Sequence, residues 1–307
     1  MCTNNIPVSP ENQITTSDGK IIDISGYSAK ELWQLHYEQE KSFANLIRQA
    51  EPFSLERAKL MNTGYETIIK IMNVRNAKPE EILQSYDARD CYIILVKRMI
   101  EKILKKKGKC LFFEAGVGNG KIMKGVASLP NVSVIGCDIF LERNNIDTHL
   151  NVYECTIYEA LSKLDDNVID VFYWNDVLEH IPEDEAEEHI NLLSKKIAHG
   201  GIIITITPNR LKGPSDITNH FEPRGSVAQG FHFHEYTFHE ILEMFKKKKI
   251  VSVYSILGNM GKGWFILGPV WMDRIKLFIE KIATKFPYKI KEKILDIMGS
   301  DVTIMKK

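Results

Sequence analysis

A glycine-rich turn is the first stretch of the chain whose residue types could do chemistry. Glu114 is followed by three alternating glycines, Gly116, Gly118 and Gly120. Glycines let the backbone bend sharply and let a ligand approach it closely. A helix that starts after such a turn offers unpaired N–H groups to the same ligand. The stretch therefore predicts that a ligand binds against the backbone at this turn.

The elements that must position this turn are a strand and a helix. Residues 111–113 form an apolar run typical of a buried strand, and residues 122–129 have the apolar spacing of a helix. Strand, tight turn and helix form the first unit of a doubly wound α/β sheet. A dinucleotide site would have the spacing G-x-G-x-x-G. Lys121 occupies the position of the third glycine, which disfavours a nicotinamide-dependent oxidoreductase.

The segment E-x-G-x-G-x-G at the end of a first strand resembles motif I of class I S-adenosylmethionine-dependent methyltransferases. The resemblance implies S-adenosyl-L-methionine as cofactor and S-adenosyl-L-homocysteine as product. It places Glu114, Gly116, Gly118 and Gly120 at the adenosyl group and the amino-acid tail. A glycine-rich turn that binds nothing is the alternative, because short motifs also occur by chance.

Two further positions belong to the cofactor site that this resemblance implies. Asp138 ends the predicted strand 132–138, and an acid there accepts the ribose hydroxyls in doubly wound folds. A solvated surface aspartate is the alternative. After the next strand the family often has an acidic residue that meets the adenine amino group. This chain has Cys155 and Thr156 at the matching positions, so a backbone contact would have to substitute.

A second motif follows a nearly continuous apolar run, 168–174, which is typical of a central parallel strand. It begins at Asn175 and closely resembles the (S/N)-x-x-L-E-H segment of small-molecule methyltransferases, such as those of quinone biosynthesis. Asn175 is expected at the carboxyl edge of the sheet, where ligands of open α/β sheets bind. Asp176, Glu179 and His180 would share one face if the turn is helical. In some relatives the corresponding residues are thought to hold a divalent metal, whereas we expect hydrogen bonds within the loop.

A long loop, 208–231, follows a predicted fifth strand, 202–207, and leads into His232 and His234. Loops of this length are usually functional or disordered. Histidine can accept a proton at neutral pH, so His180, His232 and His234 are the candidates for a catalytic base that acts on a hydroxyl acceptor. Histidines that are only packed or hydrogen-bonded are the alternative. A metal site is not expected, because no complete set of four ligands has the required spacing.

The predicted fold class is α/β: a doubly wound, Rossmann-like, seven-stranded sheet with a helical N-terminal cap. Residues 1–108 are predicted as a loose arm, to about residue 26, followed by helices that act as a packing layer or as a lid. The methyltransferase domain is expected over 109–307. Its last strands, 250–256 and 301–306, are separated by an insertion.

The insertion, 257–299, has an apolar aromatic segment followed by a lysine-rich amphipathic helix, predicted over 272–297. Its aromatic residues are expected in the core by default. The insertion could also wall a substrate pocket, form a dimer face or touch a membrane surface. The sequence does not rank these three roles.

Composition limits the classes of partner. Lys plus Arg and Asp plus Glu are both 40, so no net field attracts nucleic acid. The five cysteines form no C-x-x-C pair, as in a cytoplasmic protein with reduced thiols. No apolar run approaches the roughly 20 residues of a membrane span. We expect a cytoplasmic enzyme that methylates O or N of a small molecule (a metabolite, glycan or lipid-like acceptor), with a homodimer as one option. A methyltransferase-like binding or scaffold protein is the rival interpretation.

Overall fold

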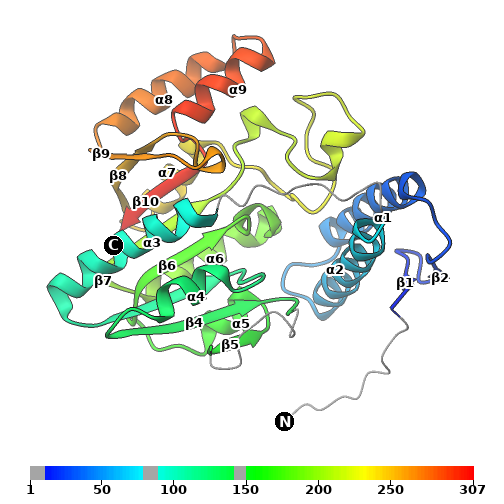
Figure 1. Ribbon diagram of the computed structural model, residues 1–307, viewed down its shortest axis with the longest axis horizontal. Helices are drawn as coiled ribbons and strands as arrows, with labels where there is room; N and C mark the ends of the chain where they lie inside the picture. Colours follow the sequence, from blue (N-terminus) through cyan, green and yellow to red (C-terminus); the bar gives the residue numbers. More distant parts are fainter. Residues whose placement is uncertain (1–10, 79–88, 142–149) are drawn as a thin grey trace. The chain divides into compact units, whose positions relative to one another are not determined.

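The computed structural model describes residues 11–78, 89–141 and 150–307. The chain forms two compact units (Figure 1). One consists of Met1–Ser85 and Gln229–Phe231, and the other consists of Tyr86–Ala228 and His232–Lys307. The segment Pro79-Glu80-Glu81 predicts a helix start in the sequence, and these residues lie outside the described part of the chain.

The smaller unit is built on two helices, α1 (Ala29–Gln49) and α2 (Leu55–Asn76). Both begin after a serine that caps the helix. The Ser28 side chain accepts the N–H of Glu31 while the Glu31 carboxylate accepts the N–H of Ser28, and Ser54 caps α2. This reciprocal pairing satisfies two backbone donors that the helix leaves open.

The structure differs from the predicted loose arm over residues 13–23. Strands β1 (Gln13–Thr15) and β2 (Ile21–Asp23) form a small antiparallel hairpin. The hairpin packs on α2, where the Thr67 hydroxyl donates to the Thr15 carbonyl at 2.7 Å, and Ile14 is 1% exposed. Strands of three residues are too short to show an alternating pattern, so their stability comes from this tertiary contact.

The larger unit is organised around a mixed sheet, which has eight strands within the described residues, ordered β5-β4-β3-β6-β7-β10-β8-β9. The first five in this order are mutually parallel, and β10 runs antiparallel between β7 and β8. Their bounds are β3 (Cys110–Ala115), β4 (Val132–Asp138), β5 (Val152–Glu154), β6 (Ile169–Asn175), β7 (Ile197–Ile206), β8 (Val251–Leu257), β9 (Ile266–Gly268) and β10 (Val302–Lys306).

This topology confirms the doubly wound fold and the last two predicted strands. The predicted sheet had seven strands, and the eighth is β9, a three-residue edge strand inside the insertion that pairs with β8. The order of the parallel strands reverses at β3 and β6. In open α/β sheets, ligands bind at the carboxyl ends of the strands at such a reversal.

Helices cover both faces of the sheet. One face packs against α3 (Arg89–Lys107) and α4 (Lys121–Ala127), and the other packs against α5 (Ile157–Ser162), α6 (Glu183–Lys196) and α7 (Phe238–Lys246). The sequence analysis grouped residues 89–107 with the N-terminal cap. In the structure, Leu95, Met99 and Ile100 of α3 are buried in the same cluster as Phe112 of β3, so α3 belongs to the sheet.

Two local predictions are corrected. The segment His199-Gly200-Gly201, whose glycines predict a helix end, lies within β7, which begins at Ile197. The predicted single helix 272–297 is two helices, α8 (Met272–Ala283) and α9 (Tyr288–Ile297). Pro287 precedes α9 and has no N–H to continue α8. Within the described residues, no helix combines the length and apolar character needed to cross a membrane.

Candidate functional site

The glycine turn lies between β3 and α4, at the reversal of strand order. Gly116 and Gly118 both have left-handed backbone, with φ of +72° and +53°. A Cβ at Gly116 would lie 2.4 Å from Cγ2 of Val177, so only glycine fits there. A Cβ at Gly118 would meet no described atom within 4 Å. The turn is therefore tight behind Gly116 and open in front of Gly118, as an approaching ligand requires.

Asp138 holds this turn in place from the neighbouring strand. Its carboxylate accepts the N–H of Gly118 at 2.8 Å and the N–H of Phe140 at 3.2 Å. Burial raises the pKa of Asp138, although these two hydrogen bonds oppose the rise. The residue predicted to bind ribose thus also fixes the shape of the glycine turn.

Glu114 and Asn175 end the two central strands next to the turn. The pairing of Ala115 with Trp174 brings the ends of β3 and β6 to one edge. The Asn175 amide donates to Asp176 at 2.9 Å, while its buried Oδ1 has no hydrogen-bond partner among the described residues. A buried acceptor without a donor costs about 1–3 kcal/mol, so Oδ1 marks a place where a donor on a ligand can bind.

Asp176 departs from the predicted helical face. Its backbone is left-handed, with φ of +53°, and the helical turn that follows covers only η2 (Leu178–His180). Asp176 therefore does not share a regular helical face with Glu179 and His180. Strained backbone at a non-glycine residue costs about 1–3 kcal/mol and is concentrated at functional sites.

Cys155 and Thr156 follow β5 at the same edge. The Cys155 N–H donates to the Asp138 carbonyl at 2.9 Å. Thr156 caps α5, and both its N–H and its hydroxyl interact with the carboxylate of Glu159 at 3.0 Å. The helix start therefore occupies the polar groups of Thr156, and Cys155 and Thr156 are both partly exposed.

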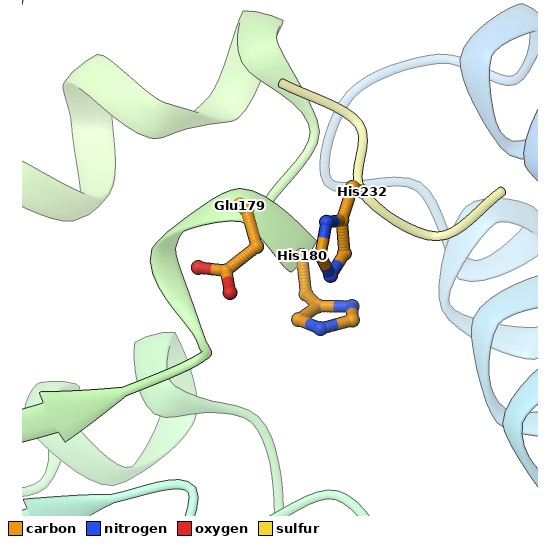
Figure 2. A group of neighbouring side chains, drawn as sticks. All are labelled: Glu179, His180 and His232. Carbon is orange, nitrogen blue, oxygen red and sulfur yellow. The ribbon is translucent and has the colours of Figure 1, made fainter. Parts of the chain in front are cut away.

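A second group of functional side chains lies beyond the end of β6. Glu179, His180 and His232 each offer one ligand or proton-binding atom, and these atoms lie within 4.8 Å of one another. Figure 2 shows Glu179 and His180 on the η2 turn and His232 on a separate loop segment that faces this turn. The rings of His180 and His232 meet edge to face, with centroids 4.7 Å apart. The sequence analysis named all three residues but did not place His232 beside Glu179.

Glu235 orients His232. Nδ1 of His232 lies 2.8 Å from the Glu235 carboxylate, which also accepts the N–H of Ser215 at 2.6 Å. Both members of this pair are buried. A carboxylate bound at Nδ1 fixes the ring and leaves Nε2 as the atom that exchanges a proton with another partner. The contact of Glu235 with His232 depends on the fold of the loop, so the sequence alone does not reveal it.

The pair Glu179 and His232 retains protons to alkaline pH. Complete burial raises the pKa of Glu179 to about 8, although the Thr207 hydroxyl donates to it at 2.8 Å. Burial alone would lower the pKa of His232, but the hydrogen bond with Glu235 and the charges of Glu179 and Glu235 outweigh it and raise this pKa to about 9. Oε1 of Glu179 is buried and has no hydrogen-bond partner in the described part of the chain.

The same three residues form a set of nitrogen and oxygen ligands that a divalent cation such as zinc accepts. A cation would need Glu179 ionised and His232 neutral. Both raised pKa values oppose that state at neutral pH. Cation binding here would therefore release protons and strengthen as the pH rises.

His234 has a different environment from His232. Its Nε2 lies 3.1 Å from the Arg210 guanidinium, and its Nδ1 lies 3.3 Å from the Glu183 carboxylate. Arg210 also donates to Glu240 at 2.7 Å. The Glu240 carboxylate, 3.9 Å from Nε2, raises the pKa of His234. The structure thus brings His180 and His232 together and places His234 in an ion-pair network.

Comparisons with known proteins give distant structural matches. No protein-family model matches the chain, and no curated protein sequence matches it. The chain is similar to a SAM-dependent methyltransferase from Archaeoglobus fulgidus, at 16% identity over 70% of this chain and 93% of that chain, with a TM-score of 0.45. It is similar to the 1,6-didemethyltoxoflavin-N1-methyltransferase of Burkholderia thailandensis, at 14% identity over 84% and 92%, with a TM-score of 0.45.

A third solved structure is the N-methyltransferase NodS from Bradyrhizobium japonicum WM9, at 12% identity over 59% of this chain and 83% of that chain, with a TM-score of 0.37. All three TM-scores are below 0.5. An assignment of function must therefore rest on the residues of the site itself.

Proposed function

We propose that this chain is an S-adenosylmethionine-dependent methyltransferase that acts on a small molecule. The observation that carries the proposal is the left-handed glycine turn at the strand reversal, open in front of Gly118 and tied to Asp138 at the end of β4. The glycine spacing differs from that of a dinucleotide site, since Lys121 begins α4 where a third glycine would be. Glu114 and Asn175 supply further polar groups at the same edge.

The cofactor would supply a methyl group that its sulfonium already activates. The work of the protein is then to align the methyl group with the acceptor atom and to exclude water. We infer that Gly118, Asp138 and Asn175 bind and orient the donor. An amine acceptor needs no further group, whereas a hydroxyl acceptor must lose its proton.

For a hydroxyl acceptor, we infer that Nε2 of His232 takes this proton. Glu235 holds the ring through Nδ1 and stabilises the charged imidazole that results. The raised pKa of His232 means that its neutral form becomes abundant only near pH 9. Methylation of a hydroxyl should therefore accelerate as the pH rises from 7 to about 9, while methylation of an amine should not depend on His232.

The first experiment is calorimetric titration of the full chain with S-adenosylhomocysteine, beside NADH. We expect binding of the former and none of the latter. Gly118→Val should abolish binding, because its side chain would fill the open space before the turn. Gly108→Val is the matched control, since Gly108 also has left-handed backbone, with φ of +72°, and no described atom within 4 Å of an added Cβ. Equal binding by both variants would contradict the proposed site.

A turnover assay then separates an enzyme from a scaffold. Labelled S-adenosylmethionine is incubated with the protein and pooled small-molecule extracts, and transfer of the label to a metabolite, glycan or lipid is measured. Binding of S-adenosylhomocysteine without any transfer would favour the scaffold interpretation. Binding of NADH in place of S-adenosylhomocysteine would favour the oxidoreductase.

A further inference from the structure

Helix α8 exposes large apolar side chains and buries three of its charged side chains. Trp271 precedes the helix and is 58% exposed, and Ile275 and Phe278 are 44% and 64% exposed. Their spacing of four and three residues places them on one helical face. On the other face, Asp273 and Lys276 are 5% and 2% exposed. This orientation is the reverse of an ordinary surface helix.

The inward charges have specific partners, which fix the rotation of α8. The Asp273 carboxylate accepts the Ser252 hydroxyl, and the Lys276 ammonium donates to the Gly299 carbonyl at 3.3 Å. One turn further on, Glu280 accepts three hydrogen bonds, from the Asn209 amide and the N–H groups of residues 238 and 239. Turning the helix to bury its apolar face would leave these charges without partners, which is costly.

The exposed charges around this apolar face have one sign. From 271 to 297, where every residue is described, the exposed charged side chains are Arg274, Lys281, Lys285, Lys289 and Lys293. Asp273 and Glu280 are buried, and the other carboxylates of this stretch are partly buried and hydrogen-bonded to Tyr288 or to Lys212 and Asn259. The stretch is therefore locally basic although the chain has no net charge.

Exposed apolar side chains are concentrated in the same segment. Of the seventeen large apolar side chains exposed in the described residues, nine lie between 264 and 297: Trp264, Ile266, Val270, Trp271, Ile275, Phe278, Phe286, Ile290 and Ile297. We call the exposed side chains of 264–297 the α8–α9 surface. Figure 1 shows α8 and α9 next to each other beyond β8 and β9.

We propose that the α8–α9 surface binds the surface of a membrane that contains anionic phospholipids. Exposed tryptophan and phenylalanine insert at the level of the lipid headgroups, and lysines around them are attracted to anionic headgroups. Helix α8 has 12 residues, so it would lie on the bilayer and not span it.

A second copy of the chain fits this surface less well. In a two-fold dimer the same patch faces itself. The five exposed cations would then lie opposite one another, while the carboxylates of the segment are turned inward or already hydrogen-bonded. An anionic surface supplies the opposite charge that a second copy lacks.

The test is flotation of the full chain with vesicles of phosphatidylcholine containing about 30% phosphatidylserine, compared with phosphatidylcholine alone. We expect binding only to the anionic vesicles, and weaker binding at high salt because salt screens the lysines. Trp271→Ser with Phe278→Ser should weaken binding by about tenfold or more. Ile94→Ser is the matched control, since Ile94 is 46% exposed on α3.

Charge reversal tests the electrostatic part separately. Lys281→Glu with Lys285→Glu should weaken binding by at least about 25-fold, since each cation near an anionic surface contributes about fivefold. Lys105→Glu with Lys106→Glu changes the same charge on exposed positions of α3 and should have little effect.

No binding to anionic vesicles, or equal loss in both charge variants, would overturn the proposal. A dimer in solution that the Trp271 and Phe278 changes dissociate, without vesicle binding, would assign the surface to a second copy. All of these measurements are independent of methyl transfer.

Discussion

Glu280 should be among the residues on which the stability of the sheet unit depends most. Its carboxylate, 5% exposed, accepts the Asn209 side-chain amide at 2.8 Å and the N–H groups of Phe238 and His239 at 2.8 and 2.9 Å. It thus neutralises the first turn of α7 from a different helix, in addition to the cap by Thr237. Hydrogen bonds to a charged group are worth about 1.5–3 kcal/mol each, although they are not additive.

Glu280→Ala leaves three donors without an acceptor, two of them in buried hydrogen bonds. We therefore expect a loss of about 3–5 kcal/mol in the free energy of unfolding, less than the sum of three hydrogen bonds to a charged group because such bonds are not additive. Glu280→Gln keeps one acceptor oxygen and should cost less, about 2 kcal/mol. The assay is urea unfolding followed by circular dichroism, with the m-value compared to show that the unfolded state is unchanged.

Glu243→Ala is the control on α7 itself. The Glu243 carboxylate makes an exposed ion pair with Lys246 at 3.0 Å, and pairs of this kind contribute little. Its removal should leave the free energy of unfolding almost unchanged. A loss below about 1 kcal/mol for Glu280→Ala would refute the reasoning, because it would mean that water or another group replaces the carboxylate. Hydrogen exchange at the amides of residues 238 and 239 localises the effect.

Three further outcomes follow from the described contacts. Glu235→Gln should lower the raised pKa of His232 toward the ordinary value, because it removes the carboxylate at Nδ1, and an NMR titration of the ring measures this. Folding raises the pKa of Glu179, so the folded state binds this proton more tightly than the unfolded state does. The resulting contribution to the free energy of unfolding is complete below about pH 4.5 and is lost as the pH rises through about 8. Glu179→Gln should make the fall in unfolding midpoint between pH 5 and 9 shallower. Gly64→Ala should lower the free energy of unfolding by about 1–2 kcal/mol, since the added Cβ would lie 2.9 Å from the ring of buried Phe231. Gly26→Ala should leave it unchanged, because an added Cβ there meets no described atom within 4 Å.

The parts of the site that sequence could predict are those whose signals are local. The glycine turn follows a strand within a few residues, and its left-handed backbone requires glycine at Gly116 whatever the rest of the chain does. Asp138 and Asn175 each end a strand whose apolar character marks its bounds. Because parallel strands end at one edge, these positions could be placed together before the fold was known.

The parts that sequence could not predict depend on segments far apart along the chain. His232 and His234 have the same residue type and alternate, so an extended chain would give them one orientation. The structure instead pairs His232 with Glu235 and Glu179, and pairs His234 with Arg210. The contacts of His232 with Glu235 and with Glu179, on the turn after β6, distinguish it from His234 as a proton acceptor. The spacing of residues along the sequence does not predict these contacts.

Helix α8 shows the same limit, and it also bears on the membrane proposal. Its sequence shows two faces but does not show which one is buried. The buried face is set by hydrogen bonds to Ser252, to Gly299 and to the start of α7, which are distant in the sequence or outside the helix. The arrangement lowers the stability of the isolated protein in two ways: it removes charges from water and leaves Trp271, Ile275 and Phe278 in water. The hydrogen bonds of Asp273, Lys276 and Glu280 offset the first cost but do not offset the exposure of the apolar face. A partner that covers this face would offset that exposure, and the single sign of the surrounding charges points to an anionic partner.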